Sequence, residues 1–211
     1  MKRATDVTVI LDRSGSMEAI ASDVIGGFNR FLADQSGQPG ECNLTLVQFD
    51  DKYEVVYVEQ PIGEAPRLTE ATFLPRGCTA LLDAIGRTID STGLRLAALP
   101  EDERPQRVLL VIITDGLENA STDFTSERVF SMISTQQDVY QWSFLFLAAN
   151  QDAIAEAAKV GIGAQQSLNF AATRAGVAEA SLSLSEAVST LRASGEAGFT
   201  NAATSRKRKV H

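Results

Sequence analysis

The chain has 211 residues, of which 44% are hydrophobic, so it is long enough to form one substantial domain around a buried core. Its formal net charge of -8 argues against nucleic-acid binding, because a nucleic-acid-binding surface needs basic side chains opposite the phosphates. The only histidine is His211, which argues against histidine-dependent catalytic triads and histidine-rich zinc sites.

The first part of the sequence predicts strands and helices in alternation. Residues 7–11 form a short β-branched apolar run, which is typical of a strand buried on both faces of a parallel sheet. Residues 43–49 and 53–58 flank a polar turn at 50–52, a pattern that indicates a hairpin and an antiparallel edge strand. Helical spacing predicts two helices, one around Val24, Phe28, Phe31 and Leu32 and one around Leu81, Leu82, Ile85 and Ile89.

The second part continues the same alternation. Residues 107–113 and 142–148 are apolar runs that predict two more buried strands, and residues 167–170 predict a short last strand. Two helices are expected between them, one around Val129, Met132 and Ile133 and an Ala-rich one from about Asp152 to Lys159, ended by Gly161. A final amphipathic helix is predicted by the spacing of Val177, Ala180, Leu184, Val188 and Leu191.

These elements predict an α/β fold with a doubly wound, mostly parallel central sheet of about six strands, one antiparallel edge strand and helices on both faces, as in Rossmann-like domains. We expect the main domain to span residues 5–172 and a C-terminal helix at 173–193 to dock on it. Residues 194–211 are rich in small and polar residues and contain the basic run 206–209, which predicts a flexible tail.

Polar residues at two predicted strand ends are the main functional signal. Asp12 and Asp115 each follow a buried strand, and ligands of doubly wound sheets bind beyond such carboxyl ends. If the two strands are neighbours, their backbones lie about 4.8 Å apart, and a shared cation would relieve the repulsion between the two carboxylates. Ser14 and Ser16 add hydroxyls, and Thr79 precedes a predicted helix, so three loops can meet at a site suited to a hard cation such as Mg²⁺.

In this order and spacing, the sequence resembles a von Willebrand factor type A (VWA) domain with a metal-ion-dependent adhesion site (MIDAS). The family's Asp-x-Ser-x-Ser, Gly-x-Thr-x-Leu and Thr-Asp-Gly motifs are matched by Asp12, Ser14 and Ser16, by Thr79 within residues 77–81, and by Asp115 within residues 114–116. The resemblance covers roughly residues 5–170, and the C-terminal part is similar to free-standing bacterial relatives.

The resemblance implies a metal site with a protein partner. It implies that Ser14, Ser16 and usually Thr79 contact the metal directly, while Asp12 and Asp115 often act through water. It also implies one coordination position left for an Asp or Glu of the partner. We therefore expect Mg²⁺, with Mn²⁺ or Ca²⁺ as alternatives, in a non-enzymatic protein-interaction module that has no catalytic residues.

Two other functions stay open at this point. The same strand ends could serve a metal-assisted hydrolase or phosphoryl-transfer enzyme, although the loop offers Arg13 and serines and the sequence has no Gly-x-x-x-x-Gly-Lys-Ser/Thr motif. Alternatively, the domain could be a regulatory or assembly subunit of an ATPase-type complex, as some bacterial relatives are. The sequence specifies neither the partner nor the oligomeric state.

Several single residues have simpler interpretations. Asp50 and Asp51 are expected to form a turn, with cation binding as the alternative. Glu118 and Asn119 either line the rim of the metal site or are solvated loop residues. We expect Cys78 to be a small buried side chain, with a redox-sensitive thiol as the alternative.

Two features predict a cytoplasmic protein without a membrane partner. The first residues contain no signal-peptide core, and no apolar run approaches the roughly 20 residues of a membrane span. The two cysteines, Cys42 and Cys78, fit buried thiols in a reducing compartment.

Overall fold

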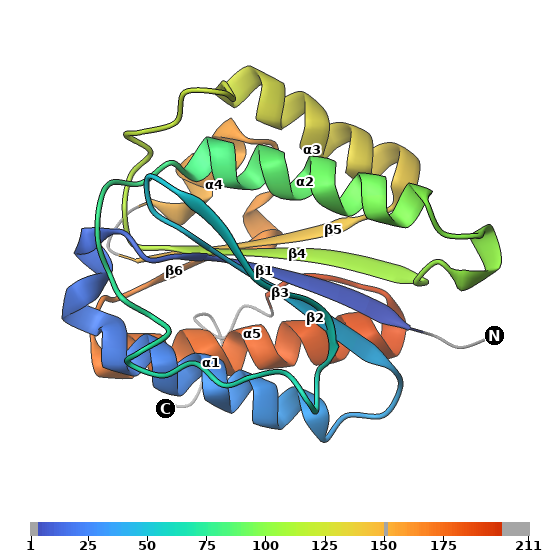
Figure 1. Cartoon of the computed structure of the whole chain (residues 1–211), viewed down its shortest axis with the longest axis horizontal. Helices are drawn as coiled ribbons and strands as arrows, with labels where there is room; N and C mark the ends of the chain where they lie inside the picture. The colour runs from blue at the N-terminus through green and yellow to red at the C-terminus, as the bar shows by residue number, and fades with distance from the viewer. Residues whose placement is uncertain (1–3, 150–151, 200–211) are drawn as a thin grey trace, which may run out of the picture.

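The computed structural model describes residues 4–149 and 152–199, and within them six strands form one sheet (Figure 1). The strand order is β3-β2-β1-β4-β5-β6, and every neighbouring pair is parallel except β2 and β3. This confirms the predicted doubly wound sheet with one antiparallel edge strand. The strands are β1 (Thr5–Asp12), β2 (Cys42–Phe49), β3 (Tyr53–Pro61), β4 (Arg107–Thr114), β5 (Ser143–Ala149) and β6 (Ser167–Phe170).

Helices cover both faces of the sheet, as Figure 1 shows. α1 (Ala21–Ser36) and α5 (Arg174–Ser194) lie on one face, and α2 (Leu81–Ala97), α3 (Ser126–Tyr140) and α4 (Ala153–Lys159) lie on the other. Short 3-10 helices occur at η1 (Gly15–Ile20), η2 (Glu101–Glu103) and η3 (Ala164–Gln166).

The central strands are buried on both faces, as their continuous apolar runs predicted. In β1, Val7, Val9 and Leu11 pack toward α1 and α5, while Ile10 packs toward α2. Each strand therefore supplies side chains to two separate hydrophobic clusters, one on each face of the sheet. The alternation of side chains along each strand therefore determines which face of the sheet the residues at the strand ends point to.

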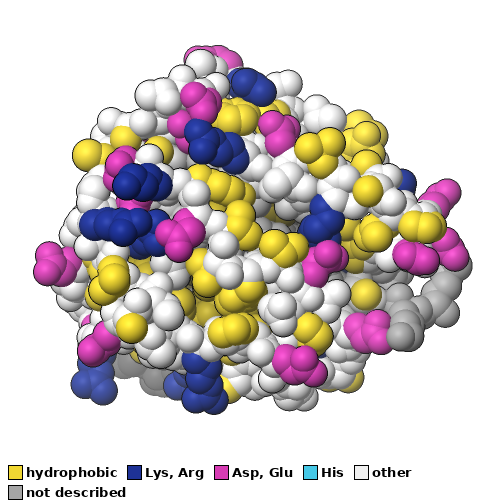
Figure 2. Space-filling model, viewed as in Figure 1, with side chains coloured by type: hydrophobic (Ala, Val, Ile, Leu, Met, Phe, Trp, Pro, Cys, Tyr) yellow, Lys and Arg dark blue, Asp and Glu magenta, His cyan; other side chains and the backbone are white. Residues whose placement is uncertain are grey.

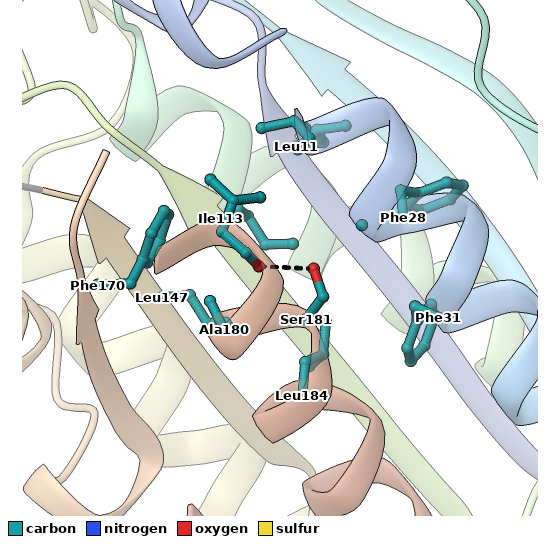
Figure 3. A pocket seen from close by; sticks show the side chains of 12 residues that line it. Leu11, Phe28, Phe31, Ile113, Leu147, Phe170, Ala180, Ser181 and Leu184 are labelled. Carbon is teal, nitrogen blue, oxygen red and sulfur yellow. Dashed lines mark hydrogen bonds between the residues drawn. The ribbon is translucent and has the colours of Figure 1, made fainter. Parts of the chain in front are cut away.

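A small apolar cavity of about 40 Å³ lies between α1, α5 and the face of the sheet that they cover. Figure 3 shows Phe28 and Phe31 of α1 on one side of it and Ala180 and Leu184 of α5 on the other. Leu11 of β1 also lines it. Because the lining is apolar, the cavity belongs to the hydrophobic core beneath the strand ends.

Local signals define the last helix. The Thr173 side chain accepts a hydrogen bond from the backbone N–H of Gly176 at the start of α5, and Gly195 ends the helix in the left-handed conformation with φ 90°. Gln35 of α1 donates its side-chain amide to Ser185 O and Ser189 Oγ at 2.9 and 3.0 Å, so α5 is held against α1 by polar as well as apolar contacts.

The chain stays in contact with the domain after α5. Phe199 donates its backbone N–H to Gln165 O at 2.8 Å and packs, with Ala197, against the core cluster. These residues belong to the predicted tail, of which residues 200–211, including the basic run 206–209, lie outside the described residues. Across residues 4–149 and 152–199, no helix is both long enough and apolar enough to span a membrane.

Candidate metal centre

The two aspartates lie at the same edge of the sheet because their strands are parallel neighbours. Leu11 of β1 is in register with Ile113 of β4; Asp12 is the next and last residue of β1, and Asp115 follows Thr114, the last residue of β4. The sequence predicted a shared cation only if these two strands are neighbours, and the structure shows that they are.

A chain of hydrogen bonds joins the two carboxylates. The backbone N–H of Ser14 donates to Asp12 Oδ1 at 2.6 Å, and Ser14 Oγ lies 3.0 Å from Ser16 Oγ. Ser16 Oγ then donates to Asp115 Oδ1 at 2.6 Å. The loop after β1 thus brings both of its serine hydroxyls between the two aspartates.

Gly116 shows that the third loop reaches the same point. A methyl group placed on its Cα would lie 2.7 Å from Thr79 Oγ1, 3.4 Å from Ser16 Oγ and 3.5 Å from Ser14 Oγ. The three hydroxyl oxygens therefore surround one small space that a single carbon atom would fill. The structure brings together all five residues that the sequence singled out.

The electrostatics of this space favour a positive charge. Asp12 is fully buried, and burial raises its pKa to about 6, although hydrogen bonds from Thr114 and Ser14 oppose the rise and the nearby Asp115 adds to it. Burial also raises the pKa of Asp115, against the hydrogen bond from Ser16. No cationic side chain among the described residues pairs with either carboxylate, so a bound cation would stabilise their ionised forms.

The chemistry of the donor set fits a hard divalent cation. All five side chains offer oxygen atoms, which Mg²⁺, Mn²⁺ and Ca²⁺ prefer. No group of three or more His, Cys, Asp or Glu side chains that could hold a metal occurs within the described ranges. The hydroxyls are therefore essential to this site, because the two carboxylates alone would supply too few ligands for a divalent cation.

Backbone hydrogen bonds hold the Thr79 loop against the serine loop. Arg76 N donates to Arg13 O at 2.8 Å, and Gly15 N donates to Gly77 O at 3.2 Å. Gly77 has a φ of +67°, a conformation that glycine adopts without strain. The two loops consequently form one unit at the ends of β1 and β2.

Asp50 connects the serine loop and the Thr79 loop through its buried carboxylate. Its carboxylate is fully buried and accepts hydrogen bonds from Arg13 Nε at 3.0 Å, Arg76 Nε at 2.8 Å and the backbone N–H of Lys52 at 2.6 Å. Burial alone would raise the pKa of Asp50, but the bonds from Arg76 and Lys52 and the charge of Arg13 outweigh it and lower the pKa. Asp50 therefore forms the expected turn and also fixes an arginine from each loop.

Asn119 and Glu118 hold the third loop in place. Asn119 Oδ1 accepts from Thr79 N at 2.8 Å, and Asn119 N donates to Thr79 O at 3.1 Å. Glu118 accepts the backbone N–H of Leu82, in the first turn of α2, at 2.9 Å. These residues are therefore not free solvated side chains: they join the Asp115 loop to the Thr79 loop, and Asn119 lies directly beside Thr79.

Asp83 extends the same connection. Its carboxylate accepts the backbone N–H groups of three consecutive residues, Thr122, Asp123 and Phe124, at 3.1, 3.0 and 2.9 Å. Because Asp83 lies in the first turn of α2, the segment that follows Asp115 is fixed to the start of that helix.

Sequence reasoning gave no role to Thr114 and placed Cys78 wrongly. Thr114 Oγ1 donates to Asp12 Oδ2 at 2.6 Å, so it orients the buried carboxylate. The only available signal was its position beside Asp115 in the Thr-Asp-Gly motif. The Cys78 side chain is exposed rather than buried, because the loop turns it outward while the adjacent Thr79 points into the site.

No protein-family model and no curated protein matches the chain, but solved structures share its fold. Proximal thread matrix protein 1 from the mussel byssus, with a zinc-occupied MIDAS motif, has a TM-score of 0.60 at 14% identity, covering 89% of this chain and 46% of that one. The von Willebrand factor type A structure from Catenulispora acidiphila has a TM-score of 0.54 at 13% identity, covering 88% and 42%.

The manganese-loaded TRAP protein of Plasmodium vivax has a TM-score of 0.51 at 16% identity, with coverage of 69% of this chain and 57% of that chain. The chain therefore has the VWA fold that its motifs predicted. It spans about half of the length of these structures, between 42% and 57%.

Proposed function

We propose that this VWA-fold domain is a non-enzymatic protein-interaction module that depends on a divalent cation. The observation that carries the proposal is the convergence of three hydroxyls, from Ser14, Ser16 and Thr79, on one space beside Asp12 and Asp115. These residues come from three separate loops, which are braced by the buried carboxylate of Asp50 and the partly buried carboxylate of Glu118.

The residues suit a cation that keeps affinity for an outside ligand. The hydroxyls of Ser14, Ser16 and Thr79 would hold it directly, and the carboxylates of Asp12 and Asp115 would balance its charge. Neutral hydroxyl ligands leave more positive charge than carboxylate ligands do. When bound, the cation supplies the positive charge that attracts an Asp or Glu side chain of a partner protein.

Mg²⁺ is the cation that we propose, with Mn²⁺ and Ca²⁺ as alternatives. Oxygen-only ligands with several hydroxyls favour small hard cations, and Mg²⁺ retains water readily, which suits carboxylates that act through water. Zinc and manganese are the metals named for two of the structures with the same fold. A comparison of binding constants for the three ions under one set of conditions tests this choice.

A cytoplasmic location also belongs to the proposal. Cys42 and the exposed Cys78 are both free thiols in the structure. Exposed free thiols persist best in a reducing compartment, which supports this location. Fractionation of the native cells, followed by detection of the protein, tests it.

The central experiment measures metal and partner binding separately. Calorimetry of Mg²⁺ into chelator-treated protein is expected to show one site, which Asp12→Asn removes. The matched control is Asp90→Asn, which changes an exposed aspartate of α2 away from the site. Affinity capture from the native host with Mg²⁺ or with EDTA then identifies the partner.

Two outcomes would contradict the proposal. Partner binding that survives both chelation and Asp12→Asn would show that the site is not used for recognition. Mg²⁺-dependent turnover of phosphoesters, abolished by the same substitution, would instead make the domain an enzyme.

A further inference from the structure

A polar pocket of about 410 Å³ lies at the opposite end of the sheet from the metal centre. Its lining comes from the starts of β4 and β5 and the ends of α3 and α5, which lie at the right-hand end of Figure 1. We call it the β4–β5 pocket and define it by Arg107, Val108, Gln137, Trp142, Ser143 and Leu191. Because β4 runs from Arg107 to Thr114, roughly 23 Å separate the pocket from the metal centre.

The lining combines an apolar floor with unused polar groups. Val108, Trp142 and Leu191 are 7%, 7% and 1% exposed, so these side chains form the floor of the pocket. The side chains of Gln137 and Ser143 also line it, and neither forms a hydrogen bond with a described residue. The pocket therefore offers hydrogen-bonding groups next to a compact apolar surface.

Arg107 gives the pocket its charge. Among the described residues that line the pocket it is the only charged one, and no described Asp or Glu forms an ion pair with it. Its Nη1 atom donates to the backbone oxygen of Arg192 at 2.5 Å, so Arg107 stabilises the end of α5. A guanidinium has five N–H donors, and no other described residue accepts one from Arg107. The remaining donors are therefore available to a ligand.

The helix ends beside the pocket do not compete for these donors, because their carbonyl groups are already paired. At the end of α3, Gln141 Nε2 donates to Gln137 O and Asp138 O at 3.2 and 3.0 Å. At the end of α5, Gly195 N donates to Leu191 O at 2.8 Å. The partner that Arg107 lacks is therefore an acceptor from outside the chain, and an anion suits its charge best.

The surroundings of the pocket determine which anion fits. The short helix η2 places Glu101, Asp102 and Glu103 at this end of the molecule, and Figure 2 shows acidic side chains along the same right-hand edge. A polyanion would meet repulsion from these groups, whereas one arginine balances one negative charge. Salt screens exposed charges beyond about 8 Å, so a small monoanion in contact with Arg107 is affected much less.

We propose that the β4–β5 pocket binds a small organic monocarboxylate. The carboxylate accepts hydrogen bonds from the planar guanidinium of Arg107, whose fork matches it, and from the side chain of Gln137 or Ser143. The apolar body of the ligand lies on Val108 and Trp142. The volume of about 410 Å³ is within the range of small-molecule sites, about 300–1,000 Å³. The site requires no metal, so its occupancy is independent of the metal centre.

The test is an NMR titration of the ¹⁵N-labelled full chain with benzoate in the presence of EDTA. Saturable shifts are expected for amides at the starts of β4 and β5 and for the indole N–H of Trp142, which is the single tryptophan of the sequence. Benzamide has the same shape without the charge and should bind at least about tenfold more weakly. Inorganic phosphate should also bind more weakly than benzoate; tighter binding of phosphate or equal binding of benzamide would contradict a monocarboxylate site.

Two variants and one control complete the test. Arg107→Gln removes the charge, and Gln137→Glu keeps Arg107 but adds a competing carboxylate to the pocket; each should weaken benzoate binding at least about tenfold. Gln60→Glu makes the same change on β3, at the far edge of the sheet, and should leave binding unchanged. Thermal unfolding establishes that each variant is folded. Absence of saturable benzoate binding to the original protein, or binding that survives both pocket variants, would overturn the proposal.

Discussion

Gly116→Ala would test the candidate metal centre without removing any ligand or charge. The added methyl would lie 2.7 Å from Thr79 Oγ1, whereas ordinary contacts begin at 3.4 Å, so the hydroxyl has to retreat by about 0.7 Å. Binding groups must hold their geometry to within about 0.5 Å, so this displacement is large enough to disrupt the site. We expect Mg²⁺ affinity to fall at least about tenfold, or about 1.4 kcal/mol.

The cost to folding should be smaller than the domain can tolerate. Overpacking of this kind typically costs about 1–3 kcal/mol, and replacement of glycine by alanine recovers about 0.4–1 kcal/mol through the unfolded chain. A domain with about 5–15 kcal/mol of stability therefore stays folded. The loss of Mg²⁺ binding should thus be measurable on a native protein.

Calorimetry and thermal unfolding, each with and without Mg²⁺, provide the assay. The matched control is Gly26→Ala, because a methyl there meets nothing within 4 Å. This control should bind Mg²⁺ as the original protein does. If Gly116→Ala also bound Mg²⁺ with unchanged affinity, the three hydroxyls would not form the cation site, and the reasoning from their convergence would fail.

Three further predictions concern the carboxylates. The pKa of Asp12, about 6, lies above the usual Asp value of 3.8, so the ionised form of Asp12 lowers the stability of the folded protein. The metal-free protein should therefore become more stable to urea as the pH falls from 7 through 6, and this gain should be smaller in Asp12→Asn. The affinity for Mg²⁺ should fall over the same pH range, because protonation removes the negative charge of Asp12. Asp83→Asn should lower the free energy of unfolding by about 1–3 kcal/mol, because it weakens the acceptor of three backbone N–H groups, whereas Asp90→Asn should have no effect in the same urea titration. Asp50→Ala should cost about 3–5 kcal/mol by the same measurement, because it removes a fully buried partner of the buried Arg13; a loss below 1 kcal/mol would contradict its role.

The sheet and the ligand set could be predicted because their signals are local. A strand such as residues 7–11 shows its burial on both faces through its continuous apolar run, and a helix shows its inner face through its spacing. Strand ends then place Asp12 and Asp115 at one edge. Thr79 is different, because no periodicity places it there; its position ahead of a predicted helix and the match to a family motif linked it to the other two loops.

The supports of the site could not be predicted because their partners are distant in sequence. Asp50 looks like an ordinary turn residue, yet it is buried by arginines 37 and 26 residues away. Asp83 looks like a solvated helix residue, yet the amides that it accepts lie 39 to 41 residues away. Neither contact leaves a periodic pattern, so only the folded arrangement reveals it.

The acidic residues around the strand ends fall into two groups according to their hydrogen-bond donors. The carboxylate of Asp50 accepts hydrogen bonds from two guanidinium groups, and its pKa is lowered, so its negative charge is compensated within the protein. Asp12 and Asp115 accept hydrogen bonds from hydroxyls and a backbone amide, no Lys or Arg in the described ranges pairs with them, and their pKa values are raised. Protein folding has therefore left uncompensated negative charge at one place beside the converging hydroxyls. This difference, rather than the number of acidic residues, indicates where a divalent cation would bind.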